Sequence, residues 1–262
     1  MAGEFEEFHE ELRSTAADLL AKDRAVEWPV LVEAGWVGLE VPEQFGGAGA
    51  TFAETAVICE EMGRAASATS YLGSAVLAVG ALNALQSSAT RDRLLSDVAA
   101  GAIRVAAALE PHEFVPDADG ADRVLVITDS GVVEASTVTP RPVLDETRRL
   151  ATVTYGGPVT MSFHSDDDVR LLRDRGAVAV ACDSLGLSEA MLAATVAYAK
   201  VRQQFGRPIG SFQAVKHACA DMQVRIAVAR QLVRAAIESV ADGRSDARTE
   251  RRESDAIVYD GL

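Results

Sequence analysis

The sequence predicts a mainly α-helical protein with a small β insert. Apolar residues recur at helical spacing through residues 1–103, short β-rich runs with Asp, Gly and Pro turns follow, and helical periodicity returns from Val169. We therefore expect an N-terminal helical domain over 1–103, a β domain over 104–165 and a C-terminal helical domain over 166–262. A chain of 262 residues is long enough to bury a sizeable core.

Helices are expected over 4–24, 28–39, from 52 onward, 72–85 and 91–100, the last capped by Thr90. The β-rich runs cover 105–109, 123–128, 132–136 and 152–155. The segment 177–201 is apolar on almost every side, which predicts burial in a helical bundle. Another long helix is expected to follow Ser211 and to end near Asp242.

Composition excludes several classes of function. The chain has 25 Lys and Arg against 39 Asp and Glu, a net charge of −14, so nucleic acid is not an expected partner. The three cysteines lie in apolar helical contexts and are expected to be core residues in a reducing compartment. The sequence contains no CxxC motif and no Cys/His cluster, so a metal site is not expected. The N-terminus is acidic without a signal-peptide core, and no apolar run approaches membrane-spanning length, so we expect a cytoplasmic protein without a membrane span.

The two long C-terminal helices are separated by a tight corner over residues 198–213, YAKVRQQFGRPIGSFQ. Gly206 and Gly210 accept backbone angles that other residues resist, and Pro208 disfavours helical geometry at the residue before it. Ser211 is expected to cap the helix that follows.

The corner carries a cation, an aromatic ring and amides: Arg202, Phe205, Gln213 and, beside them, Gln204. A guanidinium suits phosphate, a ring suits a planar ligand, and an amide suits its polar edge. The alternative interpretation is a simple helix–helix corner in which the Arg202 side chain caps the first helix.

The corner R-x-x-F-G-x-x-I-x-x-F-Q resembles that of acyl-CoA dehydrogenases, where it touches the FAD of a neighbouring subunit. Further resemblances are the P-E-x-x-G-G-x-G turn at 42–49, the E-E-x-G-R sequence at 60–64, and the segments 120–126 and 145–151 of the family's small β domain. Glu110-Pro111 corresponds to a turn that family members place over the flavin, with Leu109 replacing a Thr.

The resemblance implies an acyl-CoA dehydrogenase-like fold and FAD-dependent α,β-dehydrogenation of an acyl-CoA thioester in lipid metabolism. It implies that Arg202, Gln204, Phe205 and Gln213 bind FAD. The implied partners are acyl-CoA, further subunits in a homo- or hetero-oligomer, and an electron-transfer flavoprotein.

The sequence departs from the family pattern at three places. The segment after Pro111 is short, which predicts a reduced β domain, and the C-terminal bundle is incomplete. The family's catalytic base is a Glu at one of two places, of which one lies beyond the last residue and the other falls on Gly176-Ala177. Asp174-Arg175 precedes this position and is expected to be a solvated helix start; a two-residue slip would instead make it an acid–Arg pair.

No catalytic residue can therefore be assigned. Three explanations stay open. The chain is a non-catalytic subunit, similar to the short subunits of certain actinobacterial steroid side-chain acyl-CoA dehydrogenases; it is a truncated product; or it is a structural or binding module without a redox role.

Overall fold

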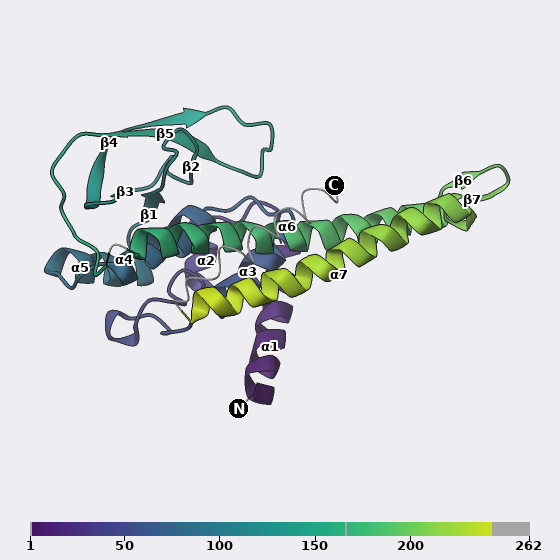
Figure 1. The fold of residues 1–262 in the computed structure, drawn as a ribbon, viewed down its shortest axis with the longest axis horizontal. Coiled ribbons are helices and arrows are strands. Elements are labelled where there is room, and N and C mark those ends of the chain that lie inside the picture. The colour runs from purple at the N-terminus through teal and green to yellow at the C-terminus, as the bar shows by residue number, and fades with distance from the viewer. Residues whose placement is uncertain (1, 166, 243–262) are drawn as a thin grey trace.

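The computed structural model describes residues 2–165 and 167–242, and the side chains from Phe8 onward within those ranges. Helices in the first hundred residues are followed by a sheet and by a long antiparallel helical hairpin (Figure 1). The helices are α1 Ala2–Leu20, α2 Trp28–Glu33, α3 Phe52–Arg64, a π-helix Leu72–Ala78, α4 Val79–Ala84, α5 Ala89–Ala99, α6 Asp168–Val201 and α7 Gln213–Ala241. The strands are β1 Val105–Ala108, β2 Val115–Pro116, β3 Arg123–Thr128, β4 Gly131–Arg141, β5 Leu150–Tyr155, β6 Gln203–Gln204 and β7 Arg207–Pro208.

The five-stranded sheet has the order β1-β3-β4-β5-β2, with β1 and β3 parallel and the other pairs antiparallel. Its residues alternate between two cores, as the pleat of a strand requires. Leu125 and Ile127 join the main helical core, whereas Val124 and Val126 join a small separate cluster on the other face. One face of the sheet is thereby fixed against the helices.

Helices α3 and α6 cross through two glycines. A Cβ on Gly63 would fall far inside contact distance of the Asp183 carbonyl oxygen, and one on Gly186 would meet the Glu60 carbonyl oxygen in the same way. Only glycine allows backbones to approach this closely. The crossing brings the C-terminal end of α3 against the middle of α6.

A buried ion pair joins α6 to the N-terminal helices. Arg175 donates to both carboxylate oxygens of Glu40, at 2.8 and 2.5 Å, and its Nε donates to the Val76 carbonyl oxygen at 2.9 Å. The guanidinium also lies 4.6 Å from the centre of the Phe52 ring. The expectation of a solvated helix start at Asp174-Arg175 is therefore wrong: α6 already begins at Asp168, and both residues are buried inside it.

Several predicted boundaries are also wrong. Helix α5 is capped by Ser88, whose Oγ accepts from the Arg91 amide at 3.2 Å, and not by Thr90. Ser211 does not cap α7, because it belongs to a 3₁₀ turn, Ile209–Ser211, and the helix starts at Gln213 after an extended residue. The helix predicted over 28–39 is shorter than expected and consists of α2 alone. The helix predicted over 72–85 divides into the π-helix and α4, and strand β2 was not predicted.

The domain division stays a prediction, although β1 and α6 begin close to its boundaries, and the C-terminal 243–262 lie outside the described residues. The expectation that no segment approaches membrane-spanning length is wrong for α6, which is long and apolar enough by length and composition. Of its most apolar 18-residue window, 44% is buried in the fold, so this is weak grounds for a membrane span.

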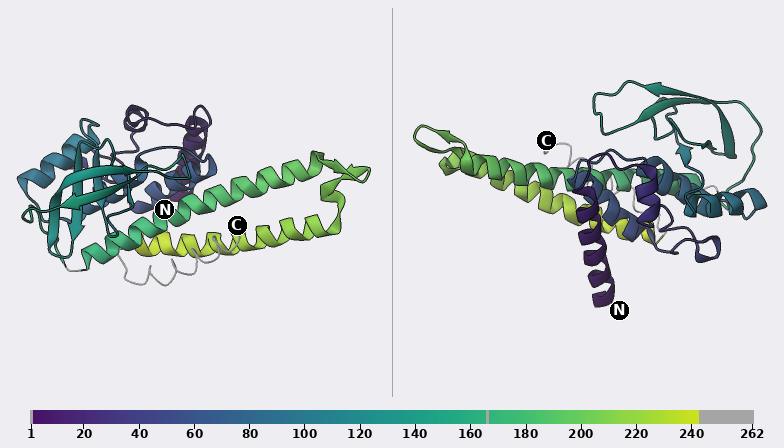
Figure 2. Two further views of the ribbon diagram at one scale, coloured as in Figure 1. Left: turned by 90° about the horizontal axis from the view of Figure 1, so that it is seen from above. Right: turned by 180° about the vertical axis from the view of Figure 1, so that it is seen from behind.

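The buried residues of α6 lie mainly between Val169 and Leu192, and beyond them Ala199 is also buried. In the second half the hairpin runs away from the sheet and from helices α1–α5 (Figure 2), and Tyr198 and Val201 are 57% and 73% exposed. The prediction of burial along all of 177–201 is therefore correct only in part.

The α3–α6 crossing generates the first prediction. Gly186→Ala should lower the free energy of unfolding by about 1–3 kcal/mol or more, because the new methyl group must push two backbones apart. Gly176→Ala in the same helix is the matched control: its Cβ would meet only the flexible end of Leu77, at 2.9 Å, and alanine favours a helix by about 1 kcal/mol. Urea denaturation compares the two. Equal stability of both variants would contradict the close crossing.

Candidate functional site

Two contiguous cavities lie between α6, the π-helix and the β region. The outer one has a volume of about 540 Å³ and the inner one about 220 Å³. Leu72, Pro116, Leu150 and Val180 line both. The two cavities are therefore adjacent.

The outer cavity contains the position at which sequence comparison predicts the missing base. Gly176 and Ala177 form part of its α6 wall, and Glu110 and Pro111 form part of the wall from the β region. The Glu110 side chain is 66% exposed and lies 3.5 Å from Arg173. No side chain at 176 or 177 can accept a proton.

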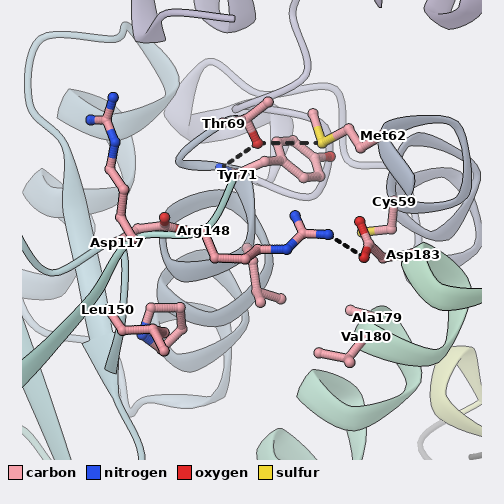
Figure 3. Close-up of a pocket in the computed structure, with 13 residues that line it drawn as sticks. Cys59, Met62, Thr69, Tyr71, Asp117, Arg148, Leu150, Ala179, Val180 and Asp183 are labelled. Atoms are coloured by element: carbon pink, nitrogen blue, oxygen red, sulfur yellow. Dashed lines mark hydrogen bonds and ion pairs between the residues drawn. The ribbon is translucent and has the colours of Figure 1, made fainter. Parts of the chain in front are cut away.

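The inner cavity is mainly apolar and has a charged pair at one side (Figure 3). Arg148, from the β4–β5 connection, extends across to α6 and donates to the Asp183 carboxylate at 2.5 Å. Burial raises the pKa of Asp183, while the neighbouring guanidinium opposes that rise. Cys59 also borders this cavity, and burial raises the pKa of its thiol, so it stays protonated and unreactive.

Asp117 lies in the wall between the inner cavity and the sheet. Its backbone is left-handed, with φ 58°, a conformation that Asp and Asn tolerate better than most residues. Its carboxylate accepts from the amide of Gly73 at 2.7 Å, at the beginning of the π-helix. Burial raises the pKa of this carboxyl to about 6, against the opposing effect of that hydrogen bond and of nearby arginines.

The predicted FAD-binding residues lie elsewhere, at the far tip of the hairpin (Figure 1). Arg202 ends α6, Gln204 pairs with Arg207 in the β6–β7 turn, and Gln213 begins α7; these side chains are exposed. Phe205 is 90% exposed and left-handed, with φ 55°. The structure brings these residues to one corner, and their role in binding FAD stays a prediction.

The prediction of an unusual backbone angle is confirmed for Gly206 but is wrong for Gly210, where glycine is required by a close approach to another backbone segment. Gly206 is left-handed, with φ 76°, and a Cβ on Gly210 would lie 2.9 Å from the Ala199 carbonyl oxygen. The backbone amide of Arg202 donates to the Tyr198 carbonyl oxygen, but among the described residues its guanidinium makes no hydrogen bond or ion pair. The alternative, in which this side chain caps α6, therefore has no contact to support it within the described chain.

Sequence reasoning missed Arg148, Asp183 and Asp117. A signal existed for Asp183, since it is an acidic residue within the apolar run VAVACDSLGL. No signal predicted that Arg148 would reach it, because the two residues belong to different elements.

Another charged cluster is structural. Glu60 of the E-E-x-G-R sequence accepts from Arg64 at 2.9 Å and from Arg230 of α7 at 3.2 Å. Glu189 of α6 pairs with both of these arginines. The cluster joins α3, α6 and α7 at the near end of the hairpin.

Two family models match the chain: acyl-CoA dehydrogenase, N-terminal domain, over residues 3–102, and acyl-CoA dehydrogenase, C-terminal domain, over 172–256. A curated relative, acyl-CoA dehydrogenase IpdE2 of Mycolicibacterium smegmatis, is 37% identical over 246 residues, covering 87% of this chain and 76% of the relative.

Two solved structures share the fold. A variant of the Tcur3481-Tcur3483 steroid ACAD superposes with a TM-score of 0.81 at 24% identity, over 93% of this chain and 81% of that one. The ChsE4-ChsE5 complex from Mycobacterium tuberculosis gives 0.76 at 21% identity, over 97% and 84%.

The buried carboxyl of Asp117 generates the second prediction. Its pKa in the folded state, about 6, exceeds the unfolded value of about 3.9, so its contribution to stability declines as pH rises through that window. Asp117→Asn keeps an oxygen for the Gly73 amide and does not titrate. Its unfolding free energy relative to wild type should therefore increase between pH 4 and pH 6, by on the order of 2–3 kcal/mol.

Asp117→Ala is the control. It removes the acceptor and favours the left-handed backbone less, so it should destabilise the protein across the whole pH range. A constant difference between wild type and Asp117→Asn from pH 4 to pH 6 would contradict the assigned pKa.

Proposed function

Because the chain belongs to the acyl-CoA dehydrogenase family, we propose that it takes part in FAD-dependent α,β-dehydrogenation of an acyl-CoA, as one subunit of an oligomeric complex. One observation carries the proposal. A single helix, α6, forms the wall of the cavities at Gly176 and ends at the exposed tip at Arg202. The 26 residues between them span about 39 Å at ~1.5 Å per residue.

That separation determines what the tip can do. A rigid helix holds Arg202 and Phe205 far from the chain's own cavities, so a cofactor that contacts the tip belongs to another subunit. The exposed guanidinium suits a pyrophosphate, the exposed ring suits a planar surface, and the amides of Gln204 and Gln213 suit a polar edge. These residues therefore fit FAD. They would contact an FAD molecule that is bound in the active site of another subunit.

Exposed apolar residues support an assembly. Met191, Tyr198, Val201 and Val224 are 52%, 57%, 73% and 62% exposed, on the projecting part of the hairpin. Apolar surface of this kind is typical of protein interfaces. A partner subunit that covers it would also place its cofactor at the tip.

The reaction requires a base for the α proton, whereas bound FAD supplies the acceptor of the β hydride. In this chain the mainly apolar wall of the outer cavity would contact the acyl group, but Gly176 and Ala177 offer no proton acceptor. We infer that the base belongs to the partner's site. An electron-transfer flavoprotein is the proposed electron acceptor, and the buried thiols of Cys59 and Cys182 are compatible with the proposed cytoplasmic location.

A second candidate is a binding or structural subunit with no contact to flavin. The lack of a base at position 176 is expected for both candidate functions. Flavin binding at the tip of the hairpin therefore distinguishes them.

The third prediction concerns Arg202. Charge-assisted hydrogen bonds to a pyrophosphate are worth roughly 1.5–3 kcal/mol each, so Arg202→Ala should weaken FAD binding by about tenfold to a hundredfold. Arg202→Lys keeps the charge but loses the planar fork, and should also lose flavin. FAD retained per chain after gel filtration of the assembled protein is the measurement.

Arg93→Ala is the control, because that side chain is 84% exposed on α5, in a different part of the fold. Melting temperatures of the flavin-free variants show whether the fold is intact. Equal flavin occupancy in all four proteins would exclude the tip as a cofactor site and favour the structural subunit.

The fourth prediction concerns the missing base. When saturated acyl-CoAs of several lengths are mixed anaerobically with the FAD-loaded chain alone, the flavin absorbance should not change. Gly176→Glu supplies a carboxylate at the position where the family places its base, and Gly176→Gln is the uncharged control. Bleaching by the wild-type chain alone would show that it contains a base, and would refute the division of labour proposed above.

A further inference from the structure

The inner cavity differs from a plain hydrocarbon pocket. Most of its wall is apolar or neutral, with Leu72, Leu150, Ala179 and Val180 among its residues. The Arg148–Asp183 pair lies at one side of it and joins the β region to α6 (Figure 3). Asp183 is seven residues beyond Gly176 in the same helix, or about 10 Å further along its axis at ~1.5 Å per residue.

This pair has unused capacity for hydrogen bonds. A guanidinium carries five N–H donors, and among the described residues the hydrogen bond of Arg148 goes to Asp183, with Asp145 at 3.9 Å. A carboxylate has about four lone-pair positions, so Asp183 can accept from a second donor. The side chains are 37% and 21% exposed, so they reach the cavity without being fully hydrated.

Charge balance restricts what the pair can bind. The cavity wall contains two arginines, Arg148 and Arg149, and two aspartates, Asp117 and Asp183. A carboxylate on a ligand would add a third negative charge with no cation to balance it, which is costly in a partly desolvated site. A neutral oxygen needs no counter-charge: a hydroxyl can accept from Arg148 and donate to Asp183, and a ketone can accept from Arg148.

We propose that the inner cavity binds the acyl end of an acyl-CoA that carries a neutral oxygen, a hydroxyl or a ketone, and that Arg148 and Asp183 select for it. The proposal rests on the proposed function, since that function identifies the two cavities as an acyl-CoA site. It assigns binding, and no chemical step, to this chain's own cavity. A site built to hydrogen-bond an oxygen discriminates strongly against the analogue that lacks it, because its polar groups are then left unpaired.

The experiment uses the full chain together with any subunit that co-purifies with it. Isothermal titration calorimetry measures its affinity for acyl-CoAs of six, eight and ten carbons, each with a terminal methyl, hydroxyl or carboxylate group or a penultimate ketone. We expect the best hydroxyl or ketone ligand to bind at least tenfold more tightly than the methyl ligand of equal length. The carboxylate ligand should bind no better than the methyl ligand.

Two variants test whether the pair causes this preference. Arg148→Met alone leaves a buried carboxylate without its partner, and the protein could unfold. The double variant Arg148→Met, Asp183→Leu replaces the pair by apolar residues, a change that buried pairs often tolerate. It should abolish or invert the tenfold preference while still binding the methyl ligands. Arg123→Met is the matched control, because Arg123 is 39% exposed and pairs with Glu134 away from the inner cavity; its preference should equal that of wild type.

The outcomes separate the proposal from the function on which it rests. If the methyl ligands bind and oxygen gives no advantage, or if the double variant keeps the advantage, the assignment of Arg148 and Asp183 is wrong and the acyl-CoA site stands. Tightest binding of the carboxylates would make the cavity an anion site and overturn the proposal. If no acyl-CoA of the series binds, the acyl-CoA site itself is refuted.

Discussion

The close crossing of α3 and α6 is the constraint on which the rest of the structure depends. Gly63 and Gly186 let the two backbones touch, and this contact sets the end of α3 beside the middle of α6. Cys59 and Met62 of α3 then border the same cavity as Asp183 of α6. A larger residue at either glycine would separate the helices, and the inner cavity would lose one wall.

The ion pair between Glu40 and Arg175 adds a second restraint on α6, closer to the N-terminus of the helix than the crossing at Gly186. A crossing point alone leaves a helix free to turn about its own axis, whereas a bidentate contact 11 residues away fixes which face meets the core. The face that bears Gly176 and Val180 is thereby directed to the cavities. The rigidly held first half of α6 in turn carries the second half, and the corner beyond it, away from the body of the protein (Figure 2).

Sequence patterns predicted the parts of this structure that depend on local chemistry. Period-2 runs gave the position of β3, and the glycines and proline of the corner gave its turn. Contacts between distant residues had no such signal. Glu40 and Arg175 are 135 residues apart, and charged residues beside a helix start are usually solvated, so Arg175 was assigned to the surface. Ser211 failed as a cap because a 3₁₀ turn moved the helix start by one residue, which cap preferences alone cannot predict.

Three of the groups of ion pairs among the described residues differ in their surroundings. Glu40, in the turn after α2, pairs with Arg175 of α6, whereas Glu60, Arg64 and Arg230 join helices α3 and α7. Both glutamate carboxylates are almost fully buried. The pair of Arg148 and Asp183 instead borders a cavity, and both partners keep part of their surface exposed to it. Because a partly buried pair adds little net stability compared with an apolar replacement, stability alone does not account for charges at this place. The proposed ligand would use the donors and acceptors that remain on this pair.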